Sequence, residues 1–104
     1  MSTDNLYNEK ELLFLLNKGD EQAFEQLYHS YSPRIFGNLV KLLKSEDIAE
    51  ELLQDVFIKI WQRRSGIDPE QSFRSYLFRI AENSVYDFFR RTARDKLLQA
   101  KLQE

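Results

Sequence analysis

Residues 45–64 read SEDIAEELLQDVFIKIWQRR, and their pattern is the strongest indication of the fold. Its apolar side chains form two neighbouring rows in which every fourth residue repeats: Ile48, Leu52, Val56, Ile60 and Ala49, Leu53, Phe57, Trp61. This spacing keeps each row on one side of an α-helix, so the two rows predict a helix with one wide apolar face. Ser45 is its predicted N-cap, and Glu46 and Asp47 suit the positive end of the helix dipole.

The sequence before this stretch predicts two more helices, over residues 8–18 and 21–43. Gly19 suits the left-handed position after a helix end, and Asp20 suits the next N-cap. Pro33 lies inside the second helix and predicts a kink or a brief interruption, because its ring removes one backbone donor and clashes with the preceding turn.

The sequence after this stretch predicts a loop over residues 65–69 and a fourth helix. Ser72 is the expected N-cap of that helix, which runs at least to Arg91. The polar tail over 92–104 is compatible with either a helix or frayed chain. The predicted fold is therefore all-α, a compact bundle of about four helices.

Composition argues against catalysis. The 104 residues form one domain with no Cys and one His, which excludes a disulfide framework, a thiolate metal site and a Cys nucleophile. His29 is expected to have a surface or packing role. No glycine-rich phosphate loop is present, and we expect neither an enzyme nor a cofactor. No apolar run reaches the length of a membrane span, and no signal peptide is recognisable, so we expect a cytoplasmic protein.

The net charge of −2 combines two unlike halves. Residues 1–55 carry a net charge of −6 and residues 56–104 carry +4. This asymmetry hints at two different partners, one of them an anion, although short helical domains also segregate charge by chance.

Two candidate binding surfaces follow from this distribution. One is the acidic side of the third helix, with Glu50, Glu51, Gln54 and Asp55, which can also be an ordinary solvated face. The other lies within residues 63–94, where seven arginines are interleaved with aromatic residues. The arginines are Arg63, Arg64, Arg74, Arg79, Arg90, Arg91 and Arg94, and the aromatic residues are Phe73, Tyr76, Phe78, Tyr86, Phe88 and Phe89. Guanidinium groups hold phosphates and rings stack on unpaired bases, although Phe73 and Phe88 fit the core better than Phe78 and Tyr86 do.

Three segments resemble region two of bacterial sigma factors of the extracytoplasmic-function (ECF) group. They are residues 18–28 (KGDEQAFEQLY), 47–61 (DIAEELLQDVFIKIW) and 73–91 (FRSYLFRIAENSVYDFFRR), in the family's order and spacing. The resemblance implies a region-two domain over 1–92 and a polar tail or linker start over 93–104. It also implies that the family's second, helix-turn-helix domain, region four, is missing.

The resemblance further implies partners and site residues. The clamp helices of the largest subunit of core RNA polymerase would contact Glu50, Glu51, Gln54, Asp55 and Phe57, with Trp61 either nearby or in the core. The non-template strand of the promoter minus-ten element would contact the loop after the third helix and the fourth helix. These DNA-facing positions are Arg63, Arg64, Ser65, Arg74, Phe78, Arg79, Asn83, Tyr86, Arg90 and Arg91. Arg79 has an alternative role in an ion pair within the domain. An anti-sigma protein is a further partner expected from the family alone.

Two other interpretations remain open from the residues themselves. A helical protein–protein adaptor would use the apolar faces for its partner and the arginines only for solubility. A general single-strand-binding bundle would explain the arginines and aromatics but would show little preference between promoter and random strands.

Overall fold

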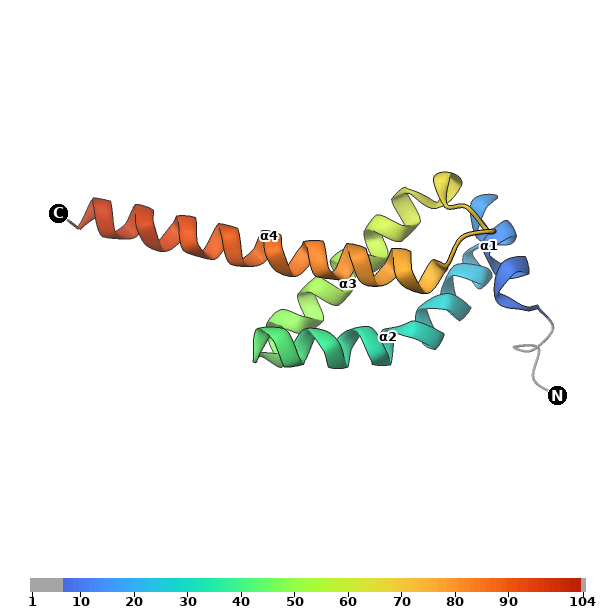
Figure 1. Ribbon diagram of the computed structural model, residues 1–104, viewed down its shortest axis with the longest axis horizontal. Helices are drawn as coiled ribbons and strands as arrows, with labels where there is room; N and C mark the ends of the chain where they lie inside the picture. Colours follow the sequence, from blue (N-terminus) through green and yellow to red (C-terminus); the bar gives the residue numbers. More distant parts are fainter. Residues whose placement is uncertain (1–6, 104) are drawn as a thin grey trace.

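The computed structural model describes residues 7–103, and within them the fold is all-α, as predicted. The elements are α1 (Glu9–Asn17), α2 (Glu21–Leu43), α3 (Glu46–Gln62), the short 3-10 helix η1 (Arg64–Gly66) and α4 (Phe73–Leu102). Figure 1 shows α2 and α3 beside the first half of α4, and α1 packs against α2 and η1. The four predicted helices are confirmed, and η1 forms the beginning of the predicted loop.

Polar side chains start each α-helix by accepting a hydrogen bond from a backbone N–H of the first turn. Asp20 accepts from Ala23 at 3.0 Å, and Ser45 and Ser72 accept at 3.2 and 3.1 Å. Asn8 caps α1 in the same way. Gly19 adopts φ +90°, the left-handed conformation predicted for it between α1 and α2.

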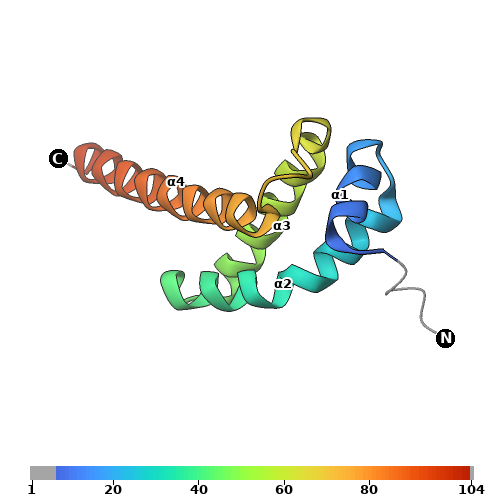
Figure 2. The same cartoon turned by 45° about the vertical axis from the view of Figure 1, so that its right-hand side comes forward.

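Helix α2 continues through Pro33 without a break. Its ribbon changes direction along its length in both Figure 1 and Figure 2, which agrees with the kink expected from a proline ring inside a helix. The helix ends at Leu43 and is capped by Lys44, whose backbone is left-handed at φ 58°.

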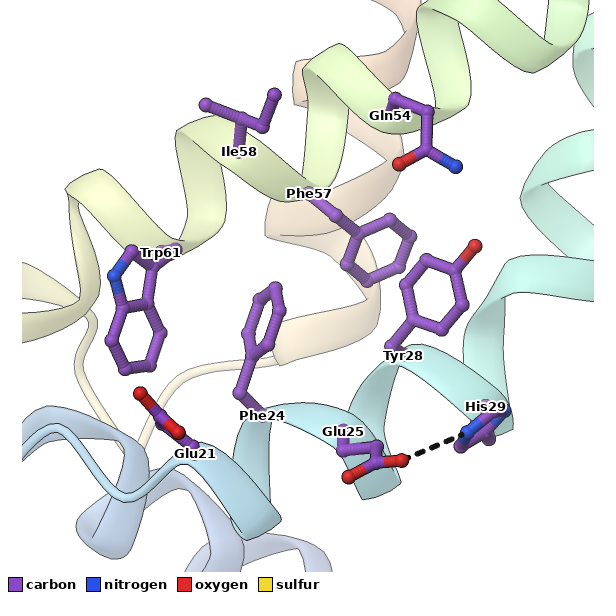
Figure 3. Close-up of a pocket in the computed structure, with 9 residues that line it drawn as sticks. All are labelled: Glu21, Phe24, Glu25, Tyr28, His29, Gln54, Phe57, Ile58 and Trp61. Atoms are coloured by element: carbon purple, nitrogen blue, oxygen red, sulfur yellow. Dashed lines mark ion pairs between the residues drawn. The ribbon is translucent and has the colours of Figure 1, made fainter.

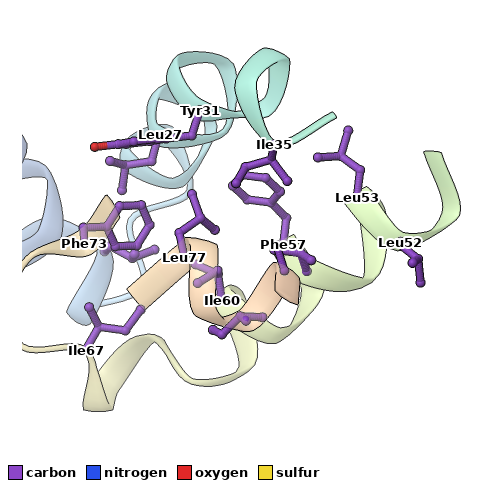
Figure 4. Close-up of a cluster of buried hydrophobic side chains, with 14 of the residues drawn as sticks. Leu27, Tyr31, Ile35, Leu52, Leu53, Phe57, Ile60, Ile67, Phe73 and Leu77 are labelled. Carbon is purple, nitrogen blue, oxygen red and sulfur yellow. The ribbon is translucent and has the colours of Figure 1, made fainter. Parts of the chain in front are cut away.

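Helix α3 packs against both α2 and α4. The face predicted from its two apolar rows is confirmed, because six of its side chains are buried: Ala49, Leu52, Leu53, Val56, Phe57 and Ile60. Ile48 and Trp61 are half-buried at the edges of that face. Figure 4 shows the α3 side chains meeting Leu27 and Ile35 of α2 and Leu77 of α4 in one core.

Helix α4 is longer than the bundle that it joins. It is helical to Leu102, so most of the polar tail is helix, while Glu104 lies outside the described residues. Its second half extends away from the other helices (Figure 2), and the molecule measures 62 × 27 × 20 Å. Residues 1–6, where no signal peptide was recognisable, also lie outside the described part. Among residues 7–103, no helix has both the length and the apolar character needed to cross a bilayer.

Candidate functional site

The acidic surface predicted on α3 is exposed to solvent. Glu50, Glu51, Gln54 and Asp55 are all exposed. The Gln54 side-chain amide donates a 3.2 Å hydrogen bond to Glu50 one turn earlier, which orients part of this surface. The face therefore presents carboxylates and an amide to a partner without needing a change in the fold.

Phe57, also predicted to face the polymerase, is 3% exposed. Its ring lies edge-on to Tyr28 and Phe24, with centroids 4.8 and 6.3 Å away. It lines a groove of about 680 Å³ between α2 and α3, together with Ile58 and Trp61 (Figure 3). Any contact that Phe57 makes with a partner is thus confined to the floor of this groove.

Sequence reasoning missed the α2 wall of the groove. Phe24 and Tyr28 of α2 are half-buried and line the groove. Glu21, Glu25 and His29 line the same groove, and Glu25 lies 3.6 Å from the exposed His29. The glutamates are ordinary surface residues in sequence, and only the packing of α2 on α3 brings them into one groove with Gln54 (Figure 3).

The loop after α3 places its two arginines differently. Arg63 and Ser65 are exposed, whereas Arg64 is half-buried. The guanidinium carbon of Arg64 lies 4.2 Å from the centre of the Trp61 ring, and the same group donates a 2.9 Å hydrogen bond to the Trp61 carbonyl. Arg64 is thus engaged within the protein, in a cation–π contact.

The predicted DNA-facing residues of α4 lie along its exposed sides. Arg74, Arg79, Asn83, Tyr86, Arg90 and Arg91 are exposed and Phe78 is half-buried. Tyr86 has 69% of its surface exposed, as expected for a ring off the apolar row. Arg74 lies near Phe78, with 5.7 Å between the guanidinium carbon and the ring centre. No ion pair of Arg79 is seen within residues 7–103.

Arg90 forms an ion pair with Asp87, one turn earlier on α4. The hydrogen bond from the Arg90 guanidinium lowers the pKa of Asp87 below its usual range. Both residues line a hollow of about 460 Å³ together with Asn83 and Tyr86. An amide, a phenol ring and a guanidinium therefore converge at one place on α4.

A second polar hollow, of about 510 Å³, lies between α3 and α4. Lys59 donates a 3.4 Å hydrogen bond to the buried Ser84 there. Three arginines line the same hollow, namely Arg90, Arg91 and Arg94. Lys59 was missed by sequence reasoning, because it lies on a different helix from the arginines and only tertiary packing brings it to them.

Within the described residues, no three His, Asp or Glu side chains come together as metal ligands would. The features that stand out are two surfaces of opposite character, an acidic one with an apolar groove and a basic one with exposed aromatic rings.

Comparison with known proteins gives this fold a family. Residues 27–95 match the model of "Sigma-70 region 2". The chain is 33% identical to the RNA polymerase sigma factor CarQ of Myxococcus xanthus over 69% of this chain and 41% of that protein. It is 36% identical to the ECF RNA polymerase sigma factor RpoE of Cereibacter sphaeroides, over 69% and 40%. With the ECF RNA polymerase sigma factor SigW of Bacillus subtilis the identity is 28%, over 89% and 50%.

The chain thus spans half or less of the length of these relatives. A solved structure, an engineered region 2 of sigmaE in complex with GTAAAA, superposes with a TM-score of 0.80 at 25% identity, over 91% of this chain and 97% of that one. The resemblance noted in the sequence is confirmed by the family match over residues 27–95 and by this fold: the chain belongs to the sigma-70 region 2 family, in its extracytoplasmic-function group.

Proposed function

We propose that this domain binds core RNA polymerase through α3 and the neighbouring groove, and that it binds the single-stranded minus-ten element of promoter DNA through α4 and the loop before it. The observation that carries the proposal is the pairing of two chemically unlike surfaces on a fold that a relative uses in a complex with GTAAAA. Carboxylates beside an apolar groove lie on α2 and α3, arginines with exposed rings lie on α4, and the two meet where Asp55 lines the hollow of Arg90, Arg91 and Arg94. The proposal also places the protein in the cytoplasm, where a bacterial polymerase works, and gives it no catalytic step.

The polymerase surface suits the clamp helices of the largest subunit. Glu50, Glu51 and Asp55 are exposed carboxylates that attract basic side chains and fix the register of a partner helix. Beside them, the groove offers apolar surface, including Ile58, which is 52% exposed. An amphipathic helix that places apolar residues in the groove and basic residues along α3 would use both features.

The DNA surface suits an unpaired strand. Arg74, Arg79 and Arg90 carry positive charge along α4 for backbone phosphates, and Tyr86 offers an exposed ring on which a base can stack. The Asn83 amide has both a donor and an acceptor, which suits the edge of a base. Extruding a base from the duplex costs a few kcal/mol, and contacts of this kind offset that cost.

A pull-down with core RNA polymerase tests the first half of the proposal. The double variant Gln54→Ala with Asp55→Lys should bind much less polymerase than the wild-type domain, because it removes an amide and reverses a charge on the proposed contact face. Glu11→Lys makes the same charge change at an exposed position of α1 and should bind normally. Equal binding by all three proteins would contradict the polymerase surface.

Fluorescence anisotropy with labelled strands tests the second half. The wild-type domain should prefer GTAAAA to a scrambled strand of the same composition, and Asn83→Ala and Arg74→Ala should both weaken binding to GTAAAA. Binding without preference would instead favour a general single-strand-binding bundle. No binding to either strand would favour a protein–protein adaptor.

An anti-sigma protein belongs to this proposal only as an expectation from the family. Such a partner would have to cover the acidic surface of α3 or the basic surface of α4 to prevent initiation. Its binding would therefore compete with polymerase or with GTAAAA in the two assays above.

A further inference from the structure

Asn17, the last residue of α1, reaches across to the loop that joins α3 to α4. Its side-chain amide nitrogen donates a 2.6 Å hydrogen bond to the carbonyl of Arg64 and a 2.9 Å bond to the carbonyl of Ile67. These partners are 47 and 50 residues away in sequence. An amide nitrogen has two N–H donors, and Asn17 donates both of them to carbonyls of the loop.

The loop has few backbone hydrogen bonds of its own. Gly66 and Ile67 donate to the carbonyls of Arg63 and Arg64 at 3.0 and 3.3 Å, which forms η1. The carbonyl of Ile67 accepts from Asn17, while the Ile67 side chain is 6% exposed and joins the core. Since carbonyls shielded from water need a partner, the Asn17 amide stabilises this loop conformation where the chain turns inward.

Arg64 holds the same part of the loop from its other side. Its guanidinium stacks on Trp61 at the end of α3 and also lies beside Gly19, where an added Cβ would be 3.5 Å from the arginine Nε. At the far end of the loop, Lys10 of α1 forms a 2.8 Å ion pair with Glu70, although exposed pairs of this kind contribute little. The loop is thus attached to α1 and to the turn after it.

We propose that Asn17 is a positioning residue for DNA recognition: it holds the loop after α3 in the conformation that binds the promoter strand, without touching DNA itself. This inference rests on the proposed DNA-binding function of the loop. A loop that is already ordered loses little conformational entropy on binding, whereas a released loop would first have to be ordered. If releasing the loop leaves one molecule in ten competent, the apparent affinity falls about ten-fold.

The structure supplies a reporter that needs no DNA. Trp61 is the single tryptophan of the chain, and the Arg64 guanidinium covers its ring. Release of the loop should uncover Trp61 and increase the quenching of its fluorescence by acrylamide. The variant Arg64→Ala, which lacks the covering group, sets the signal expected for an uncovered ring.

The test compares two variants at position 17 with a core variant. Asn17→Leu keeps the size of the side chain and removes both donors, and Asn17→Ala serves as the second variant if leucine prevents folding. Ile35→Val is the control, because it destabilises the core, where Ile35 is 0% exposed, through a residue of α2 outside the loop. Circular dichroism confirms that each variant is folded at the assay temperature.

We expect both Asn17 variants to show increased Trp61 quenching, about ten-fold weaker binding to GTAAAA and a smaller preference over the scrambled strand, with normal binding to core polymerase. Ile35→Val should match the wild type in all four measurements: quenching, affinity for GTAAAA, strand preference and polymerase binding. Folded Asn17 variants with wild-type affinity and preference would overturn the inference. If the wild-type domain itself shows no preference for GTAAAA, the proposed function fails. The acrylamide quenching of Trp61 then tests the attachment of the loop by itself, and wild-type quenching in the Asn17 variants would overturn that attachment as well.

Discussion

The hydroxyl of Tyr31, in the middle of α2, donates a hydrogen bond to the carboxylate of Glu9 in the first turn of α1. The tyrosine side chain is 9% exposed and its ring lies edge-on to Phe73 of α4, with 5.5 Å between the centroids. Burial, followed by the hydrogen bond and the charge of Glu9, raises the pKa of Tyr31 from 10.0 to about 12. One residue thus connects α1, α2 and α4.

This raised pKa predicts a loss of stability in alkali. The folded-state pKa of Tyr31 exceeds its unfolded value, so the contribution is fully present below pH 10 and is lost as the pH rises through about 12. By pH 11 the loss should be about 1 kcal/mol. Tyr31→Phe cannot ionise, and near pH 8 it should be about 1 kcal/mol less stable because the hydrogen bond is gone. Urea unfolding at pH 8, 10 and 11 should show the difference between the two proteins closing, and a constant difference would contradict the role assigned to ionisation.

Two glycines predict opposite effects of the same substitution. Gly19 has φ +90°, a conformation that an alanine adopts only with strain, so Gly19→Ala should lower the free energy of unfolding by about 1–2 kcal/mol. Gly37 lies inside α2 with open space around its Cα, so Gly37→Ala should raise it by about 0.5–1 kcal/mol. Urea unfolding of both variants gives the comparison. A stabilising change at position 19 would show that the turn tolerates a side chain there.

The helices of this fold are predictable because their signals are local. Ser45 and Ser72 are followed by apolar residues at helical spacing, and both cap helices where expected. The positions of Phe73 and Leu77 in the core follow from the same spacing. The length of α4 was less defined, because the polar tail over 92–104 has no strong breaker to end it and only three leucines, Leu97, Leu98 and Leu102, to continue an apolar spacing.

The side-chain contacts that hold the site in place could not be predicted in the same way. Asn17 ends a helix in sequence, and nothing near it indicates a bond to the carbonyl of Ile67, 50 residues later. Lys59 and Ser84 meet only because α3 packs on α4. Arg64 looked equivalent to its neighbour Arg63, and the position of Trp61 under its guanidinium distinguishes them. The first two contacts depend on tertiary packing, which periodicity along one helix does not specify. The contact between Arg64 and Trp61 is local and depends on how the chain turns at the end of α3.

The groove between α2 and α3 predicts a second way to weaken polymerase binding. Ile58 lines this groove and is 52% exposed, so Ile58→Glu should leave the fold intact but place a charge where an apolar contact is proposed. A side chain that anchors such a contact costs about 1 kcal/mol or more when it is lost, which is about a five-fold or larger loss of affinity. Leu42→Glu is the matched control, because Leu42 is 46% exposed on α2 and does not line the groove. Equal losses in the two variants, measured by pull-down with core polymerase, would argue that the groove is not a specific contact.

The salt dependence of DNA binding separates the roles proposed for Arg74 and Asn83. A cation that neutralises one phosphate of a single strand adds about 0.7 to the slope of log affinity against log salt concentration. Arg74→Ala should therefore reduce this slope by about 0.7 and weaken binding to GTAAAA and to its scrambled form alike. Asn83→Ala should leave the slope unchanged and reduce the preference between the two strands, because an amide reads a base edge and releases no counterion. Lys41→Ala removes the same charge from an exposed position of α2, outside the basic surface, and should change neither quantity. A slope that falls as much in Lys41→Ala as in Arg74→Ala would mean that the strand responds to overall charge rather than to α4.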